Sequence, residues 1–466
     1  MKYRLILMVC ITLLMGCTKA HLEIFPELNN PKLSERKLSI QQMHQDIDYF
    51  FANALKLHPD IALYADQNTL KKAAVQYKSE ITQPLTRTDF YRIVGKLSHH
   101  FQDGHAFLLW PYQELNQLKA NNDKPFPFDV VLSKSGELVV KYTYTYLNSK
   151  IPAGSRITRI NGINVTEMIN HMQQYVGGET RLLREQVVAK RFAINLWSVY
   201  GLINTFSIDY TFDEQGFTLD IEPEHLWQVS NSNRQMSAYN YQKLNNSTGL
   251  LFFEHFDIDP SEFEDFIDTA FEKIKRDKIS NLIIDIRTNP GGNTDTVTYL
   301  SRHLADKPFR LISQLKEKLN QHNRGLFNYR GKVGEVLTTQ WNDWQTPVDE
   351  TKRFVGNTYV LIGNVSYSAA IVFATTMQDN QFATLVGEKT GGFANQSAQG
   401  NLFNLPHSQL RAFIATRLLV RPNGNLERQS VIPDVMISAN LDDIKQQRDP
   451  SIDYILNLEA NSGSTK

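Results

Sequence analysis

The chain has 466 residues, of which 41% are hydrophobic, and its 49 Lys and Arg residues balance 49 Asp and Glu residues. The hydrophobic content excludes a mostly disordered chain, and the even charge argues against a nucleic-acid-binding protein, which usually carries a basic excess. At about 150 residues per domain, the length predicts about three domains.

The N-terminus is typical of a bacterial lipoprotein signal. Early cations precede an apolar run over residues 5–15, which is too short for a membrane span because a span needs about 20 residues. The run ends in Gly16-Cys17, which resembles a lipobox, in which the Cys is acylated and becomes the first mature residue. We therefore expect a signal and a lipidated Cys17 within residues 1–17, followed by a tether over residues 18–38.

The chain has 2 Cys residues. Cys10 would leave with the signal and Cys17 would carry lipid, which excludes a disulfide, a zinc–thiolate site and a Cys nucleophile in the exported part. Thr18, in place of the Asp associated with inner-membrane retention, favours the outer membrane facing the periplasm if the cell is Gram-negative. The alternative is an ordinary Cys17 within a weak transmembrane anchor.

Residues 39–125 are predicted to form a helical domain. Apolar residues recur at helical spacing after Ser39, a favourable N-cap residue. Further helices are predicted over residues 70–81 and 88–100, the latter with Thr88 among its start signals.

Residues 126–220 change to short β-like runs. The string IPAGSRITRING over residues 151–162 resembles the core of a PDZ domain, where a strand ends in a hairpin turn. Asn161-Gly162 suits such a turn because both residues tolerate a positive φ, although any β-hairpin can contain this pair. We expect a PDZ-like domain here, with a helix over residues 165–175.

Residues 221–466 alternate apolar runs with helical patterns. This alternation predicts parallel βαβ units and therefore an α/β core. The predicted strands lie at residues 250–253, 282–286 and 359–362, and the predicted helices at 261–275, 295–304 and 368–377.

Two segments of this core carry groups suited to acyl transfer. The strand before residues 289–292 ends in NPGG, at the edge where α/β folds bind ligands, and its Gly N–H groups can donate to an oxyanion. Ser366 and Ser368 stand between a strand and a helix, where the helix dipole stabilises a nucleophilic alkoxide. Taken alone, the first segment is more typical of a tight turn, and either Ser of a helix cap.

Together the segments resemble peptidase family S41, which includes C-terminal processing peptidases, tricorn core proteases and interphotoreceptor retinoid-binding protein. The resemblance covers roughly residues 90–440 and implies an α+β multidomain fold with a helical region, a PDZ-like β domain and a ClpP/crotonase-like α/β core. The matching strings are LIIDIRTNPGG at 282–292, SYSAA at 366–370, QD at 378–379 and VGEKTGG at 386–392.

The resemblance implies Ser368 as the nucleophile, with oxyanion donors at the N–H of Ala369 and of Gly291 or Gly292. The processing peptidases of the family use a Lys base. This chain has Phe393 at that position, and a phenyl ring cannot accept a proton.

The tricorn-like branch instead uses a His and a Glu. His105, within DGH, and Glu427, within ERQSVIPD, match their motifs. The resemblance therefore implies a Ser368–His105–Glu427 relay, in which the imidazole carries the proton and the carboxylate orients it. Ile371 departs from the family, which usually has Glu there.

Two other chemistries fit less well. Lys389 lies four residues before the family's Lys position. His99, His100 and His105 with Asp103 match no zinc-ligand spacing, so no metal or other cofactor is expected.

The predicted function is an exported serine endopeptidase, anchored through lipid on Cys17, that hydrolyses peptides or unfolded proteins through an acyl-enzyme. The PDZ-like module would recruit an extended segment by strand addition, and no nucleic acid is expected as a partner. The alternatives are an inactive protein on the same scaffold that binds a peptide or an apolar ligand, and a structural envelope lipoprotein.

Overall fold

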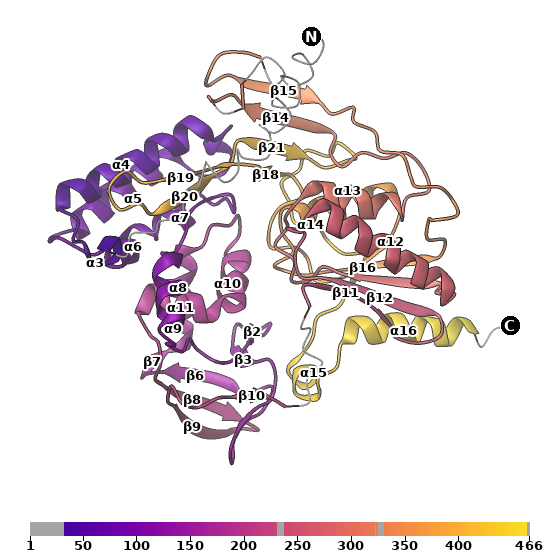
Figure 1. The fold of residues 1–466 in the computed structure, drawn as a ribbon, viewed down its shortest axis with the longest axis horizontal. Coiled ribbons are helices and arrows are strands. Elements are labelled where there is room, and N and C mark those ends of the chain that lie inside the picture. Colours follow the sequence, from indigo (N-terminus) through magenta and orange to yellow (C-terminus); the bar gives the residue numbers. More distant parts are fainter. Residues whose placement is uncertain (1–31, 231–236, 322, 325–329, 464–466) are drawn as a thin grey trace, which may run out of the picture.

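The computed structural model describes residues 32–230, 237–321, 323–324 and 330–463 (Figure 1). The predicted signal with Cys17 and the first part of the tether lie outside these ranges, so the lipoprotein assignment stays a prediction. Within the described ranges, no helix is both long enough and apolar enough to cross a membrane.

The N-terminal region is helical, as predicted. The side chain of Ser39 accepts a hydrogen bond from the N–H of Gln42, and the Gln42 side chain accepts one from the N–H of Ser39. This reciprocal pair satisfies two N–H groups that a helix start leaves open. The elements are α3 (Lys32–Glu35), α4 (Ile40–Leu57), η1 (Ile61–Leu63), α5 (Gln67–Glu80), α6 (Arg87–Val94), α7 (Leu97–His100) and α8 (Tyr112–Ala120).

The single helix predicted over residues 88–100 is wrong, because this stretch holds two helices, α6 and α7. The N-cap of α6 is Thr86, whose side chain accepts from the N–H of Asp89, so α6 begins before Thr88. Gly95 follows α6 as its C-cap. It lets the ring of Tyr175 approach, since a Cβ at this position would lie 2.7 Å from that ring.

The second region contains a six-stranded antiparallel sheet in the order β2-β3-β6-β8-β9, with β7 paired to β6. The predicted turn at Asn161 and Gly162 joins β6 to β7, and both residues have positive φ, 49° and 77°. The strands are β2 (Val130–Leu132), β3 (Leu138–Val140), β6 (Arg156–Ile160), β7 (Ile163–Asn164), β8 (Phe206–Phe212) and β9 (Gln215–Ile221), and a smaller sheet holds β4 (Tyr144–Tyr146), β5 (Ser149–Ile151) and β10 (Gln228–Val229).

Helices interrupt this second region between β7 and β8. The first pair contains the helix predicted over residues 165–175, whereas the last two helices are not foreseen in the sequence analysis. They are α9 (Val165–Met172), η2 (Gln173–Tyr175), α10 (Arg181–Lys190) and α11 (Phe192–Tyr200). Their side chains share one apolar core with the N-terminal helices, so these parts pack as one body.

The third region holds the predicted parallel strands. Its six-stranded sheet has the order β11-β12-β13-β16-β17-β22, and β11 pairs antiparallel at one edge. All five residues of β13 are buried because helices cover both faces of the sheet. The strands are β11 (Tyr239–Lys243), β12 (Thr248–Phe253), β13 (Asn281–Asp285), β16 (Asn357–Ile362), β17 (Thr384–Gly387) and β22 (Val435–Met436).

Figure 1 shows how helices cover this sheet: α12, α13 and α14 lie on one side and α16 on the other. The sequence predicts the first three helices to within a few residues. The bounds are α12 (Pro260–Arg276), α13 (Thr294–Arg302), α14 (Ala369–Asn380), α15 (Leu441–Gln446) and α16 (Pro450–Gly463).

Two further sheets complete the fold, and the first of them connects two regions. β1 follows His105 directly and pairs with β20, which pairs with β19, so a C-terminal segment completes a sheet of the N-terminal region. The other sheet has the order β15-β14-β21-β18. The strands are β1 (Ala106–Leu108), β14 (Gln314–Lys318), β15 (Val336–Gln340), β18 (Gln396–Ala398), β19 (Asn401–Asn404), β20 (Arg411–Ile414) and β21 (Arg417–Val420).

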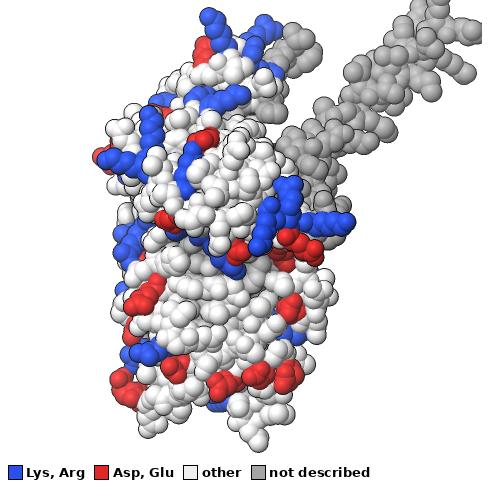
Figure 2. Space-filling view, turned by 90° about the vertical axis from the view of Figure 1, so that its left-hand side faces the viewer, with Lys and Arg blue, Asp and Glu red and all other residues white. Residues whose placement is uncertain are grey.

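Charges of both signs are interspersed over the face shown in Figure 2. This distribution agrees with the equal numbers of cationic and anionic side chains in the sequence.

Candidate active site

The two segments singled out in the core lie side by side. β13 and β16 pair in parallel, so the turns that follow them emerge at the same edge of the sheet. The N–H of Tyr367 donates to the carbonyl of Asn289 at 2.9 Å, which ties the second turn to the first. The NPGG turn therefore lies against the residue before Ser368.

Ser368 has a strained backbone, with φ 54° and ψ −120°. A non-glycine residue in such a region costs about 1–3 kcal/mol and is typical of functional sites. The turn needs Gly291 as its neighbour, because a Cβ there would lie 2.6 Å from the Cβ of Ser368. Although Ser368 precedes α14, its side chain makes no capping hydrogen bond, so its hydroxyl is available for other partners.

Ser366 has a structural role by contrast. Its Oγ donates to the carbonyl of Ile286 at 2.7 Å and accepts from the N–H of Gly363 at 3.0 Å. It is completely buried. The first hydrogen bond ties the turn to the end of β13, and the second closes the turn itself.

His105 reaches Ser368 from the N-terminal region. Its Nε2 lies 3.1 Å from the Oγ of Ser368, a hydrogen-bond distance. The two residues are 263 positions apart in the chain, and the pairing of β1 with β20 holds the His105 segment in place.

The other nitrogen of His105 faces two hydroxyl groups. Its Nδ1 lies 3.0 Å from the Oγ of Ser397 and 3.3 Å from the hydroxyl oxygen of Tyr367. Ser397 donates its proton to Asp103 Oδ1 at 2.5 Å, and Tyr367 donates its proton to Glu179 Oε1 at 2.7 Å. Both hydroxyl oxygens are thus left to accept from Nδ1–H. This arrangement selects the tautomer in which Nε2 has a free lone pair directed at Ser368.

Asp103 is fixed from several sides. Its Oδ2 lies 2.8 Å from Nε2 of His58, and its Oδ1 also accepts from the N–H of His105 at 2.8 Å. Burial opposes the ionisation of Asp103, but the hydrogen bonds and the nearby imidazoles outweigh it and lower the pKa of this carboxyl. Asp103 is therefore an anion at neutral pH.

Burial lowers the pKa of His105 below its ordinary value, although the charge of Asp103 acts in the opposite direction. The imidazole is therefore neutral near pH 7, which is the form that accepts a proton.

The N–H groups near Ser368 differ in their partners. The N–H of Gly291 donates to Oδ1 of Asn289 at 2.8 Å. Among the residues that the structure describes, the N–H groups of Ala369 and Gly292 have no acceptor. Gly292 lies against the backbone of the loop that follows β12, because a Cβ at Gly292 would lie 2.1 Å from the N of Asp257.

The structure does not bring the side chain of Glu427 to His105. Glu427 is exposed, and its carbonyl oxygen accepts from Nδ2 of Asn395 at 3.0 Å. Both nitrogens of His105 have the other partners described above. The orienting role of Glu427 therefore stays a prediction without a contact to support it.

The two positions that depart from the family pattern carry no ionisable side chain. The ring of Phe393 packs under the Arg428 guanidinium, 5.2 Å away, and Ile371 is completely buried in the core. Neither position offers a base near Ser368.

The sequence analysis misses Ser397, Tyr367 and Glu179 as neighbours of His105. It names Asp103 only as a candidate metal ligand. The position of Asp103, two residues before His105, is a signal that could have identified it as a partner of the imidazole. Nothing in the local sequence marks Ser397 or Glu179. Gln396 is also missed, and its Nε2 donates to the carbonyl of Ser368 at 2.9 Å.

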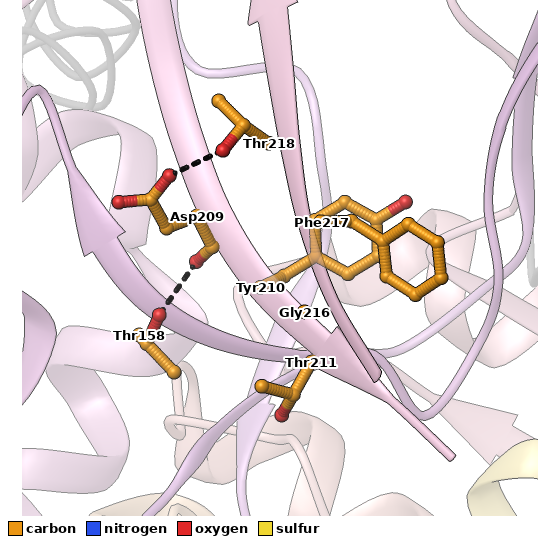
Figure 3. A pocket seen from close by; sticks show the side chains of 7 residues that line it. All are labelled: Thr158, Asp209, Tyr210, Thr211, Gly216, Phe217 and Thr218. Carbon is orange, nitrogen blue, oxygen red and sulfur yellow. Dashed lines mark hydrogen bonds between the residues drawn. The ribbon is translucent and has the colours of Figure 1, made fainter. Parts of the chain in front are cut away.

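Two other kinds of site find no support within the described residues. No group of three or more His, Cys, Asp or Glu side chains is placed to hold a metal ion in the described ranges. A hollow of about 280 Å³ on β8 and β9 contains no nucleophile–base pair, and Asp209 in its wall already accepts from Thr218 at 2.8 Å (Figure 3).

The chain is similar to several known proteins. The model of peptidase family S41 matches residues 247–437. The chain is 25% identical over 182 residues to a carboxy-terminal-processing protease of Bartonella bacilliformis, covering 39% of this chain and 36% of that protein. It is 23% identical over 168 residues to a carboxyl-terminal-processing protease of Picosynechococcus sp., covering 36% of this chain and 34% of that protein.

The alignments therefore span about a third of the length of these two relatives. Among solved structures, mature CPAF complexed with lactacystin has a TM-score of 0.67 at 14% identity, covering 90% of this chain and 97% of that one. This likeness shows a shared fold over most of the chain. The family match and the two relatives support a serine-type peptidase.

Proposed function

Since the model of peptidase family S41 matches residues 247–437, we propose that the chain is a serine endopeptidase that cleaves peptides or unfolded proteins through an acyl-enzyme. The observation that carries this proposal is the 3.1 Å approach of His105 Nε2 to the Ser368 hydroxyl. Nucleophile and base within hydrogen-bond distance, with the base oriented from its other side, are the geometric requirement for this chemistry.

In the proposed mechanism, Nε2 of His105 takes the proton of Ser368 while Oγ attacks the peptide carbonyl. The N–H groups of Ala369 and Gly292 then stabilise the oxyanion, since both lack another acceptor within the described residues. His105 protonates the leaving amine, and water releases the acyl group by the reverse sequence.

We propose Asp103 as the carboxylate that supports His105, in the role predicted for Glu427. Asp103 acts through the hydroxyl of Ser397, which accepts from Nδ1–H and donates to Oδ1. When the imidazole becomes a cation, the anionic Asp103 lowers the energy of that state.

The substrate class follows from the relatives. Both matched relatives are named for carboxyl-terminal processing. We therefore propose C-terminal peptide segments as the first substrates to test, with the region of β2 to β9 as a PDZ-like module that recruits them. Export and lipid anchoring through Cys17 complete the proposal and place the enzyme at the cell envelope.

The experiment is hydrolysis of casein and of peptides with free C-termini by the purified chain and by a Ser368→Ala variant. We expect the variant to fold with an unchanged circular dichroism spectrum and to lose hydrolysis. Ser135→Ala, at an exposed hairpin turn, is the matched control and should retain hydrolysis. Hydrolysis that persists in Ser368→Ala contradicts the proposal, and a wild-type chain that neither cleaves nor reacts with fluorophosphonates supports the inactive binding protein instead.

A further inference from the structure

The mechanism above leaves one buried carboxyl beside the site unused. Glu179 lies in the loop between η2 and α10, and it is 8% exposed. Its Oε1 accepts from the Tyr367 hydroxyl, whereas its Oε2 is buried and has no hydrogen-bond partner within the described residues. A buried carboxyl group with one oxygen that makes no hydrogen bond is costly, so its presence calls for a physical explanation.

Tyr367 connects this carboxyl to both members of the proposed dyad. It precedes Ser368 in the chain, and its hydroxyl oxygen lies 3.3 Å from Nδ1 of His105. Two glycines hold the ring from both sides: a Cβ at Gly104 would lie 2.3 Å from the Tyr367 hydroxyl, and one at Gly392 would lie 2.5 Å from the ring. The hydroxyl therefore has a fixed place beside the imidazole.

The loop that carries Glu179 is anchored on both sides of the site. A Cβ at Gly177 would lie 2.8 Å from the carbonyl oxygen of Asp103, so the loop packs on the His105 segment. The hydroxyl of Thr180 donates to the carbonyl of Gly391 at 2.6 Å, which ties the loop to the core. The loop thus spans the two parts that supply base and nucleophile.

The two branches at Nδ1 of His105 have the same connectivity, but one ends in an anion and the other in a neutral carboxyl group. In each, a hydroxyl accepts from Nδ1–H and donates to a carboxyl group. Asp103 is an anion, but burial and the charge of Asp103 raise the pKa of Glu179 to about 8. Near pH 7 Glu179 is therefore neutral and supplies an acceptor without adding a second buried negative charge.

We infer that Glu179 is a positioning residue for the peptidase reaction, because through the Tyr367 hydroxyl it holds His105 in the orientation that faces Ser368. This inference rests on the proposed function. Two acceptors bracket Nδ1–H, so rotation of the ring away from Ser368 would break both contacts. The loop of the second region thereby completes a site whose nucleophile belongs to the core.

The test compares kcat and KM for Glu179→Ala, Glu179→Gln and Tyr367→Phe. We expect Glu179→Ala to lower kcat about 10- to 100-fold with little change in KM, because a small misplacement of a reacting group has an effect of this size. Tyr367→Phe keeps the ring between its glycines and loses the hydroxyl, so it should lower kcat by a similar factor. Glu179→Gln keeps a neutral acceptor for the Tyr367 hydroxyl and should restore most of the lost kcat.

The pH profile supplies a readout that a purely structural role would not change. The groups that face Glu179 are Tyr64, Asp103, Arg428, Arg184 and Tyr367. In the wild type, kcat/KM should rise as His105 loses its proton, and it should rise a second time above pH about 8, where the ionised Glu179 favours the imidazolium formed during the reaction. Glu179→Gln should lack this second rise.

Thermal melts of each variant establish that the chain is folded. Equal kcat in the wild type, Glu179→Ala and Tyr367→Phe overturns the inference, and so does a Glu179→Gln variant as impaired as Glu179→Ala. If Ser368→Ala is inactive in the same assay, either result leaves the proposed function standing. Hydrolysis by Ser368→Ala would contradict both the proposed function and the inference on Glu179.

Discussion

The nucleophile side and the base side of the site are built in different ways. Ser368 and the NPGG turn owe their positions to backbone: two parallel strands end at one edge, and a glycine lets the turns touch. Strand pairing holds the His105 segment, but the orientation of its ring depends on side chains from distant parts of the chain, with Ser397, Tyr367, Asp103 and Glu179 around it. One half of the site thus follows from strand pairing and turn geometry, whereas the other depends on long-range hydrogen bonds between side chains.

The largest effect is expected on the base side, at His105 itself. We expect His105→Ala to lower kcat/KM about 10⁴-fold or more, since removal of one member of a catalytic relay leaves little beyond oxyanion stabilisation. Peptide hydrolysis measures the effect, with His225→Ala as the control because that ring stacks on Tyr146 in another sheet. A loss of less than tenfold would show that His105 is not the base.

On the nucleophile side, the largest effect should come from Gly291→Ala. Gly291 has a φ of 105°, and the new Cβ would meet the Cβ of Ser368 at 2.6 Å, so the turn must shift. We expect kcat to fall about 100-fold because a shift of about 1 Å at the reacting atoms has that effect. Gly216→Ala is the matched control, since nothing lies within 4 Å of its Cβ position. Equal activity in both variants would contradict the close packing of the two turns.

The two candidate carboxylates can be ranked directly. We expect Asp103→Asn to lower kcat by about 100-fold or more by removing the charge that supports the imidazolium, and Ser397→Ala to have a smaller effect because Tyr367 still accepts from Nδ1–H. Glu427→Gln should change kcat less than about twofold, because the exposed Glu427 side chain does not contact His105. A larger loss in Glu427→Gln than in Asp103→Asn would restore the relay predicted from the sequence.

The smallest effect concerns stability. Burial lowers the pKa of several imidazoles, and that of His100 falls to about 4. Because these rings stay neutral in the folded state, their contribution to stability is complete above pH about 6.5 and decreases as the pH falls toward the folded-state values. The other rings are His99, His105, His171 and His303.

We therefore expect the unfolding temperature to fall between pH 6.5 and pH 4, as measured by circular dichroism. His100→Gln can keep a contact with the hydroxyl of Tyr77, 3.0 Å from Nε2, and should flatten this dependence. An unfolding temperature that is constant over this range would contradict the neutral state of these rings.

The sequence predicts the nucleophile side well for a physical reason. Strand, turn and helix patterns around residues 282–292 and 359–377 are local, and the parallel pairing of their strands follows from the βαβ order. The sequence accordingly names Ser368 as the candidate nucleophile, with Gly291 or Gly292 as an oxyanion donor, before any coordinates are known. The start of α6 shows the limit of local signals, since Thr86 and Thr88 are both suitable cap residues and the helix uses Thr86.

The base side is predicted only in part. His105 is found through its motif, but its partners Ser397 and Glu179 lie in segments with no pattern of their own. Their roles depend on contacts across 292 and 188 residues, respectively, which local periodicity does not encode. The carboxylate expected at Glu427 rests on family order alone, and the described contacts favour Asp103 instead.

The most direct measurement is to map by mass spectrometry the residue that a fluorophosphonate modifies. The account predicts a single adduct on Ser368 in the wild type, with its formation slowed at least a hundredfold in His105→Ala because the hydroxyl then lacks its base. An adduct on Ser366 or on any other residue, or modification of Ser368 at an unchanged rate in His105→Ala, would contradict it.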